Sequence, residues 1–124
     1  MMPNSCPSLK VLCVDDSKSD LLLSERVLTT KGFDVITAME GETAIELIKE
    51  HSFDIAVLDY QMPRTNGLEL ARQIRQIRGE LPIILYSGAV PSEAKGSIWI
   101  DCAVDKNDGC NGLLRAIHDV MKKQ

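Results

Sequence analysis

VLCVDD, at residues 11–16, is the stretch that decides the fold class, because four apolar residues run without interruption and end in two acids, Asp15 and Asp16. A strand that is apolar on both faces is typical of a parallel sheet covered by helices on both sides. A second run of this kind, Ile83-Ile84-Leu85-Tyr86, ends in Ser87-Gly88. We therefore interpret the chain as an α/β protein built on parallel strands.

Short apolar runs alternate with helical patterns along the rest of the chain. The predicted strands cover residues 10–16, 34–39, 55–60, 83–88 and 102–106. The predicted helices cover about 18–30, 41–50, 66–78, 92–99 and 111–122. Five βα units with right-handed crossovers predict a flavodoxin-like, doubly wound (βα)5 three-layer sandwich, for which we adopt the common strand order 2-1-3-4-5.

The length and charge of the chain limit its class. Its 124 residues suffice for one core and not for two, so we expect a loose N-terminal arm at 1–8 and a single domain at 9–124. The longest apolar stretches are four residues, far below the roughly 20 that span a bilayer, and no signal peptide is readable. A net charge of −4 and few aromatic residues disfavour direct nucleic-acid binding.

The cysteines lack the paired spacing of a zinc or redox motif. We expect them to be reduced thiols, and Cys13, inside an apolar run, to behave as a small hydrophobic residue. This usage favours a cytoplasmic location. The four positions are Cys6, Cys13, Cys102 and Cys110.

Acids collect at the ends of the predicted strands. Asp15 and Asp16 follow the first strand and Asp59 ends the third. Because parallel strands end at one edge of the sheet, we expect these carboxylates to meet there, and they repel one another unless they share a cation. Oxygen-only ligands suit Mg²⁺, with Mn²⁺ as a substitute.

Two further strand ends supply phosphate-binding chemistry. Lys106, after the fifth strand, offers an ammonium group to a phosphoryl oxygen, and Ser87, after the fourth, offers a hydroxyl. A carboxylate, a cation, a lysine and a hydroxyl around one cavity are the parts that transfer a phosphoryl group to an aspartate. Asp59 is the predicted acceptor, because it ends the central strand.

These residues occur in a characteristic order: Val14-Asp15-Asp16, then Asp59-Tyr60-Gln61-Met62-Pro63-Arg64-Thr65-Asn66-Gly67, then Ser87-Gly88 and Lys106. From about residue 9 to 122 the chain resembles the receiver domain of two-component response regulators, as in chemotaxis receivers. The resemblance implies that Asp59 is the phosphoacceptor, and that Asp15, Asp16, Asp59 and the backbone carbonyl of Gln61 hold Mg²⁺. It also implies that Ser87 and Lys106 respond to phosphorylation.

The same resemblance implies a set of partners. The phosphoryl donor would be a sensor histidine kinase or a histidine phosphotransfer protein, and the output would pass to a downstream protein or a covalently linked domain. Such a domain does not turn over an independent substrate, so we do not expect an enzyme. Gln61 and Ala89 occupy positions expected to meet the attacking water, so we expect them to influence the lifetime of the phosphoryl group.

The chain departs from the family pattern in one region. Asn107 stands where a proline usually follows the lysine, and Ala103 stands where a tyrosine or phenylalanine usually rotates as a switch. The segment from Ser87 to Lys106 is short, and Gly96 weakens its helix. We therefore expect signalling through another surface, or phosphoryl shuttling to a phosphotransfer protein without a large switch.

Two other functions stay open at this stage. A pseudo-receiver would act as a phosphorylation-independent docking module with a vestigial acid pocket. A phosphohydrolase is less favoured, since Gln61 cannot serve as its acid. Outside the site, Arg72, Arg75 and Arg78 predict a solvated basic stripe, with docking of an acidic partner as the alternative, and Trp99 predicts a partly buried anchor.

Overall fold

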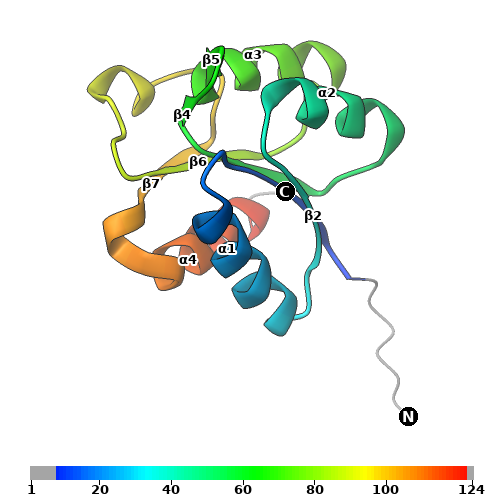
Figure 1. Cartoon of the computed structure of the whole chain (residues 1–124), viewed down its shortest axis with the longest axis vertical. Coiled ribbons are helices and arrows are strands. Elements are labelled where there is room, and N and C mark those ends of the chain that lie inside the picture. Colours follow the sequence, from blue (N-terminus) through cyan, green and yellow to red (C-terminus); the bar gives the residue numbers. More distant parts are fainter. Residues whose placement is uncertain (1–7, 123–124) are drawn as a thin grey trace.

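The computed structural model describes residues 8–122, in which a five-stranded parallel sheet lies between two layers of helices (Figure 1). The order of its strands across the sheet is β2-β1-β3-β6-β7, which is 2-1-3-4-5 when these five are counted along the chain. The predicted order is confirmed. The strands are β1 (Lys10–Val14), β2 (Asp34–Ala38), β3 (Ile55–Leu58), β6 (Ile83–Ser87) and β7 (Cys102–Asp105).

Four α-helices cover the two faces of the sheet. Figure 1 shows α1 (Lys18–Thr30) and α4 (Gly109–Lys122) on one face, and α2 (Gly41–Glu50) and α3 (Gly67–Ile77) on the other. Each of these helices was predicted within a few residues. A short hairpin of β4 (Gln61–Met62) and β5 (Thr65–Asn66), which was not predicted, joins β3 to α3.

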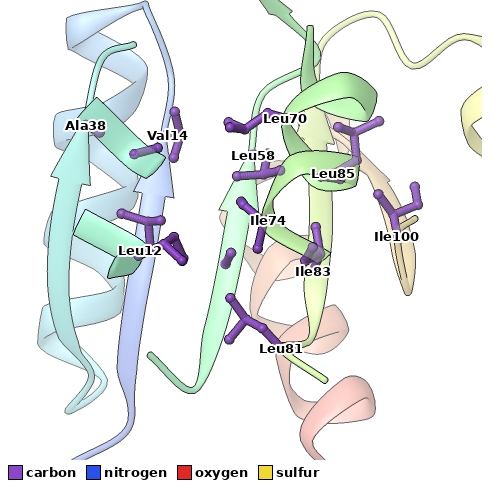
Figure 2. Packing of buried hydrophobic residues seen from close by; sticks show 14 of the residues in the cluster. Leu12, Val14, Ala38, Leu58, Leu70, Ile74, Leu81, Ile83, Leu85 and Ile100 are labelled. Atoms are coloured by element: carbon purple, nitrogen blue, oxygen red, sulfur yellow. The ribbon is translucent and has the colours of Figure 1, made fainter. Parts of the chain in front are cut away.

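Both faces of the sheet are apolar because each one is covered. Leu12 and Val14 pack with Leu70 and Ile74 of α3 on one face, and Figure 2 shows these side chains together. The alternate residues of β1, Val11 and Cys13, pack with residues of α1 and α4 on the opposite face. This arrangement explains why the strand reads as a continuous apolar run. Burial raises the pKa of the Cys13 thiol to about 12, with smaller contributions from Glu25 and Asp15, so this thiol stays protonated.

The predicted helix at 92–99 is wrong. Between β6 and β7 the chain makes only a short 3₁₀ turn, η1 (Ser92–Ala94), and returns as an irregular segment. The return must cross the length of a five-residue strand, roughly 16 Å, which a helix needs about 11 residues to span. Residues 88–101 would then leave too few for the two connecting loops. Pro91 and Gly96 also disfavour a longer helix there.

Arg75 fastens this return segment to the rest of the domain, which corrects the prediction that Arg75 lies on a solvated stripe. Its guanidinium donates to the carbonyl oxygens of Trp99 (3.2 Å) and Leu81 (2.6 Å) and pairs with the carboxylate of Asp101 (2.8 Å). The same Asp101 oxygen accepts from the amide of Ile83 at 2.8 Å. Arg75 thus links α3 to the return segment at Trp99 and Asp101, and to the loop before β6 at Leu81.

The other two members of the stripe differ from Arg75. Arg72 forms an ion pair with Glu69 one turn earlier on α3, and Arg78 is exposed. Trp99 is half-buried and packs against the core, as predicted.

Two further predictions concern the chain ends and membranes. Residues 1–7 of the predicted N-terminal arm lie outside the described residues, as does Cys6. Within residues 8–122, no helix has both the length and the apolar character needed to cross a membrane.

Candidate functional site

The acid cluster lies where β1 and β3 end side by side. Asp15 directly follows β1, and its amide donates to the carbonyl oxygen of Ala38 (3.1 Å). Asp59 directly follows β3, and its amide donates to the carbonyl oxygen of Val14 (2.9 Å). These bonds extend the parallel ladder by one residue and fix both side chains at the same edge of the sheet.

Three carboxylates meet at this edge, as predicted. Asp15, Asp16 and Asp59 each bring an oxygen to within 4.8 Å of the others, and they are the acidic group with metal-binding geometry among residues 8–122. Asp15 and Asp59 are buried, while Asp16 is exposed. The cluster is therefore enclosed by the protein at Asp15 and Asp59 and open to water at Asp16.

Lys106 reaches the cluster from the end of β7, an edge strand of the sheet. It lies one residue beyond β7, at the start of η2 (Lys106–Asp108), so β7 ends one residue earlier than predicted. Its Nζ lies 2.6 Å from Asp15 Oδ2 and 3.9 Å from Asp59 Oδ2. Within the acid cluster, the lysine is therefore hydrogen-bonded to Asp15 and lies close to the predicted acceptor, Asp59, without a hydrogen bond to it.

Lys106 keeps its charge in this setting. Burial by itself would lower the pKa of the lysine, but hydrogen bonds to Asp15 and Asp20 and the charge of Asp59 outweigh it, so the pKa is raised. A permanent ammonium group faces the acceptor carboxylate.

Asp59 is hard to ionise. Burial raises its pKa from the ordinary 3.8 to about 6, and the neighbouring charge of Asp15 adds to the rise. A hydrogen bond from Ser87 and the charge of Lys106 act in the opposite direction and are too weak to cancel it. Near neutral pH the carboxylate is ionised, and its burial makes the ionised form costly.

This pKa predicts a dependence of stability on pH. Because the folded state holds the Asp59 proton more tightly than the unfolded state, stability falls as the pH rises from about 4 to about 6 and stays lower above that range. We expect the fall due to this group to be on the order of 2 kcal/mol in the metal-free protein. Denaturant titrations of the wild type and Asp59→Asn at several pH values would isolate it. Parallel stability profiles for the two proteins would contradict the raised pKa.

Ser87 and Ala89 lie where the fourth strand of the sheet ends. Ser87 is buried and pairs in register with Asp105, the residue before Lys106. Its hydroxyl accepts from the amide of Ala89 at 3.4 Å, and Ala89 is exposed. The same hydroxyl lies beside the acid cluster, since its hydrogen bond to Asp59 lowers the pKa of that carboxyl, and Ala89 lies on the solvent side.

The β4–β5 hairpin carries Gln61 out of the core. Gln61 is exposed and pairs with Asn66, whose side chain caps α3 by accepting from the amide of Glu69 at 2.9 Å. The tight turn between the strands places Arg64 at a φ of +69°, a left-handed conformation that is uncommon for this residue type. The role of the Gln61 carbonyl as a metal ligand stays a prediction.

Ala103 lies away from the acid cluster. It stands opposite Leu85 in the sheet and is half-buried against the core on the face that α2 and α3 cover. Since an alanine has no alternative rotamer, position 103 carries no side chain that could rotate.

Asp20 belongs to the site, and sequence reasoning missed it. Its Oδ2 lies 2.8 Å from Lys106 Nζ. In the sequence, Asp20 looks like an ordinary acid in the first turn of a helix, where the helix dipole stabilises negative charge. Its position one turn after the acid pair was the available signal.

The sequence matches the family described as response regulator receiver domain over residues 11–111. The chain belongs to this family. The receiver domain's matched region contains Asp15, Asp16, Asp59, Ser87 and Lys106, so the residues described above are all part of the family match.

A sensor protein contains a related sequence. This receiver domain is 48% identical over 68 residues to the virulence sensor protein BvgS of Bordetella pertussis, a match that covers 55% of this chain and 6% of BvgS. The chain therefore corresponds to a small part of that relative's length.

Solved receivers superimpose on most of this chain. The chemotaxis protein CheY4 of Vibrio cholerae superimposes with a TM-score of 0.86 at 27% identity, covering 91% of this chain and 98% of that one. The response regulator TrrA of Thermotoga maritima, solved in complex with Mg²⁺ and BeF, superimposes with a TM-score of 0.82 at 27% identity, covering 90% and 98%.

Proposed function

We propose that this receiver domain accepts a phosphoryl group on Asp59 from the phosphohistidine of a sensor histidine kinase or a phosphotransfer protein. The observation that carries the proposal is the meeting of the acid cluster with Lys106 at one edge of the sheet. A carboxylate oxygen of Asp59 attacks phosphorus, the bond from phosphorus to the histidine nitrogen breaks, and that nitrogen keeps the electron pair. The product is an aspartyl phosphate.

Each neighbour of Asp59 has a role in this transfer. The ammonium group of Lys106 neutralises charge that develops on the phosphoryl oxygens, and the Ser87 hydroxyl donates to one of them. The exposed position of Asp16 keeps the opposite side open to the donor.

The acid cluster fits Mg²⁺, with Mn²⁺ as a substitute. Its ligands are hard carboxylate oxygens within 4.8 Å of one another, and exposure on the Asp16 side leaves room for the water that Mg²⁺ retains. Asp15, Asp16 and Asp59 would hold the ion together with the Gln61 carbonyl. When bound, the ion supplies positive charge for the phosphoryl oxygens. The complex of TrrA with Mg²⁺ and BeF supports this proposal.

Several further assignments belong to the same proposal. The domain turns over no independent substrate, and Gln61 and Ala89 tune the lifetime of the aspartyl phosphate. Because Ala103 cannot rotate, the output passes through another surface to a downstream protein or linked domain, or onward as the phosphoryl group itself. We place the domain in the cytoplasm, where thiols such as Cys13 stay reduced, and expect neither nucleic acid nor membrane as a direct partner.

The proposal is tested with acetyl phosphate as a small donor. We expect intact mass spectrometry to show one added phosphoryl group in the presence of Mg²⁺, and at least a tenfold smaller yield when a chelator removes the ion. The adduct should be sensitive to hydroxylamine, as an acyl phosphate is. Absence of any adduct would favour the docking-module alternative, and steady turnover of a phosphate ester would favour a phosphohydrolase.

A further inference from the structure

Lys106 is held by two carboxylates that belong to different parts of the molecule. Its Nζ lies 2.6 Å from Asp15 Oδ2 and 2.8 Å from Asp20 Oδ2. The third carboxylate, that of Asp59, lies 3.9 Å away, beyond hydrogen-bonding distance. An ammonium group has three N–H donors, so two of them are used here and one is left over.

Asp20 reaches Lys106 from α1, which lies beside α4 on the same face of the sheet (Figure 1). Its backbone is fixed by the start of this helix, since the Ser17 hydroxyl accepts from the Asp20 amide at 3.4 Å. The Asp20 side chain is 46% exposed, whereas the Lys106 side chain is 17% exposed. The lysine is therefore enclosed, and Asp20 closes its solvent side.

The two carboxylates that bond to Lys106 differ in whether they could also bind a cation. Asp15 is a member of the acid cluster. Its Oδ1 accepts from the amide of Ser17 at 2.9 Å and its Oδ2 accepts from Lys106, so a cation bound at the cluster would compete with the lysine for this carboxylate. Asp20 lies outside that cluster, so its bond to the lysine does not compete with the cation. Of the two contacts, the one to Asp15 would have to be shared when a cation binds, whereas the one to Asp20 would not.

We propose that Asp20 is a positioning residue, which holds the Lys106 ammonium beside Asp59 without letting it bond to the acceptor oxygen. This inference rests on the proposed phosphoacceptor function. Without the Asp20 carboxylate, the nearest acids to the ammonium are Asp15 and Asp59. The lysine then shifts onto Asp59, where it ties up the oxygen lone pair that must form the bond to phosphorus and leaves the position that receives the phosphoryl oxygens.

Asp20→Asn is the variant that tests the inference, because it removes the charge and keeps the shape. With acetyl phosphate and Mg²⁺, we expect the rate of adduct formation to fall about tenfold. In this reaction the bond from Asp59 to phosphorus forms, the bond from phosphorus to the acetate oxygen breaks, and acetate leaves with the electron pair. Glu25→Gln, which removes one charge from the same helix without a contact to Lys106, is the matched control and should react like the wild type.

A second readout needs neither metal nor phosphoryl transfer. A lysine ammonium that is held by ion pairs gives slowly exchanging N–H signals in nitrogen-15 NMR, and we assign the Lys106 signal by its loss in Lys106→Arg. We expect this signal in the metal-free wild type and in Glu25→Gln, and its loss in Asp20→Asn. Amide spectra would verify that the variants are folded.

The outcomes separate the two proposals. If Asp20→Asn keeps the wild-type rate and the Lys106 signal, the inference is overturned. An equal loss of rate in the Lys106→Ala background would also overturn it, because Asp20 would then act without the lysine. If the wild type takes up no phosphoryl group, the proposed function fails, and the ammonium signal alone decides whether Asp20 holds Lys106.

Discussion

Asp59→Asn takes up no phosphoryl group from acetyl phosphate under conditions in which the wild type is modified: this is the largest effect that we expect. The amide is almost the same size as the carboxylate, so it fits the same buried position at the end of β3. Its neutral oxygen is a far weaker nucleophile, and its loss of charge also removes one of the three acids available to a cation. Intact mass spectrometry after incubation with Mg²⁺ provides the measurement.

The control for this result is Asp119→Asn, which removes an exposed acid on α4 and should be modified like the wild type. A thermal melt should show Asp59→Asn to be at least as stable as the wild type above pH 6, because the substitution removes the cost of a buried charge. An undiminished adduct in Asp59→Asn would assign the acceptor to another residue, which peptide mapping would identify.

Gly67→Ala is expected to destabilise the fold by about 3 kcal/mol. A Cβ atom at this position would lie 2.5 Å from the carbonyl oxygen of Asp59 and 2.5 Å from Leu85 Cδ1. The first of these is backbone, which cannot move aside without shifting the acceptor residue. At the start of α3, the Gly67 amide also donates to the carbonyl oxygen of Tyr60 (2.7 Å). The helix therefore cannot move away from β3 without losing this bond.

Gly96→Ala is the matched control, since no atom lies within 4 Å of the Cβ that it would add. We expect it to be neutral or to stabilise the fold by about 0.5 kcal/mol, because alanine restricts the unfolded chain. Denaturant titration gives both values. Equal stabilities of the two variants would show that the contact of Gly67 with the end of β3 relaxes at little cost.

Much of the fold was readable from local sequence. The apolar runs at Val11–Val14 and Ile83–Tyr86 became central strands because each face of the sheet is covered by two helices. The predicted site residues Asp15, Asp59 and Lys106 meet because parallel strands end at one edge. The alternation of apolar runs and helical patterns along the chain predicted both the central strands and the meeting of these residues at the strand ends.

The errors have a common origin. The helix predicted at 92–99 satisfied a local pattern, but the distance back across the sheet and the few residues available did not allow it. Arg75 belonged to a stripe that looked solvated, whereas its guanidinium donates to the carbonyl oxygen of Trp99 in the return segment and to that of Leu81, just before β6. In both cases the outcome depended on parts of the fold outside the local segment: the length of the sheet for residues 92–99, and distant bonding partners for Arg75.

The sequence by itself determined the parallel α/β class, the residues of the acid cluster and the chemistry that these residue types allow. Strand periodicity and side-chain type are properties of short segments, so they can be read before the chain is folded. Only the tertiary structure decided that Asp20 bonds to Lys106, a residue 86 positions away, that Arg75 links α3 to the return segment and that Gly67 must lack a side chain. These features depend on how closely distant segments approach one another in space, a distance that no local pattern contains.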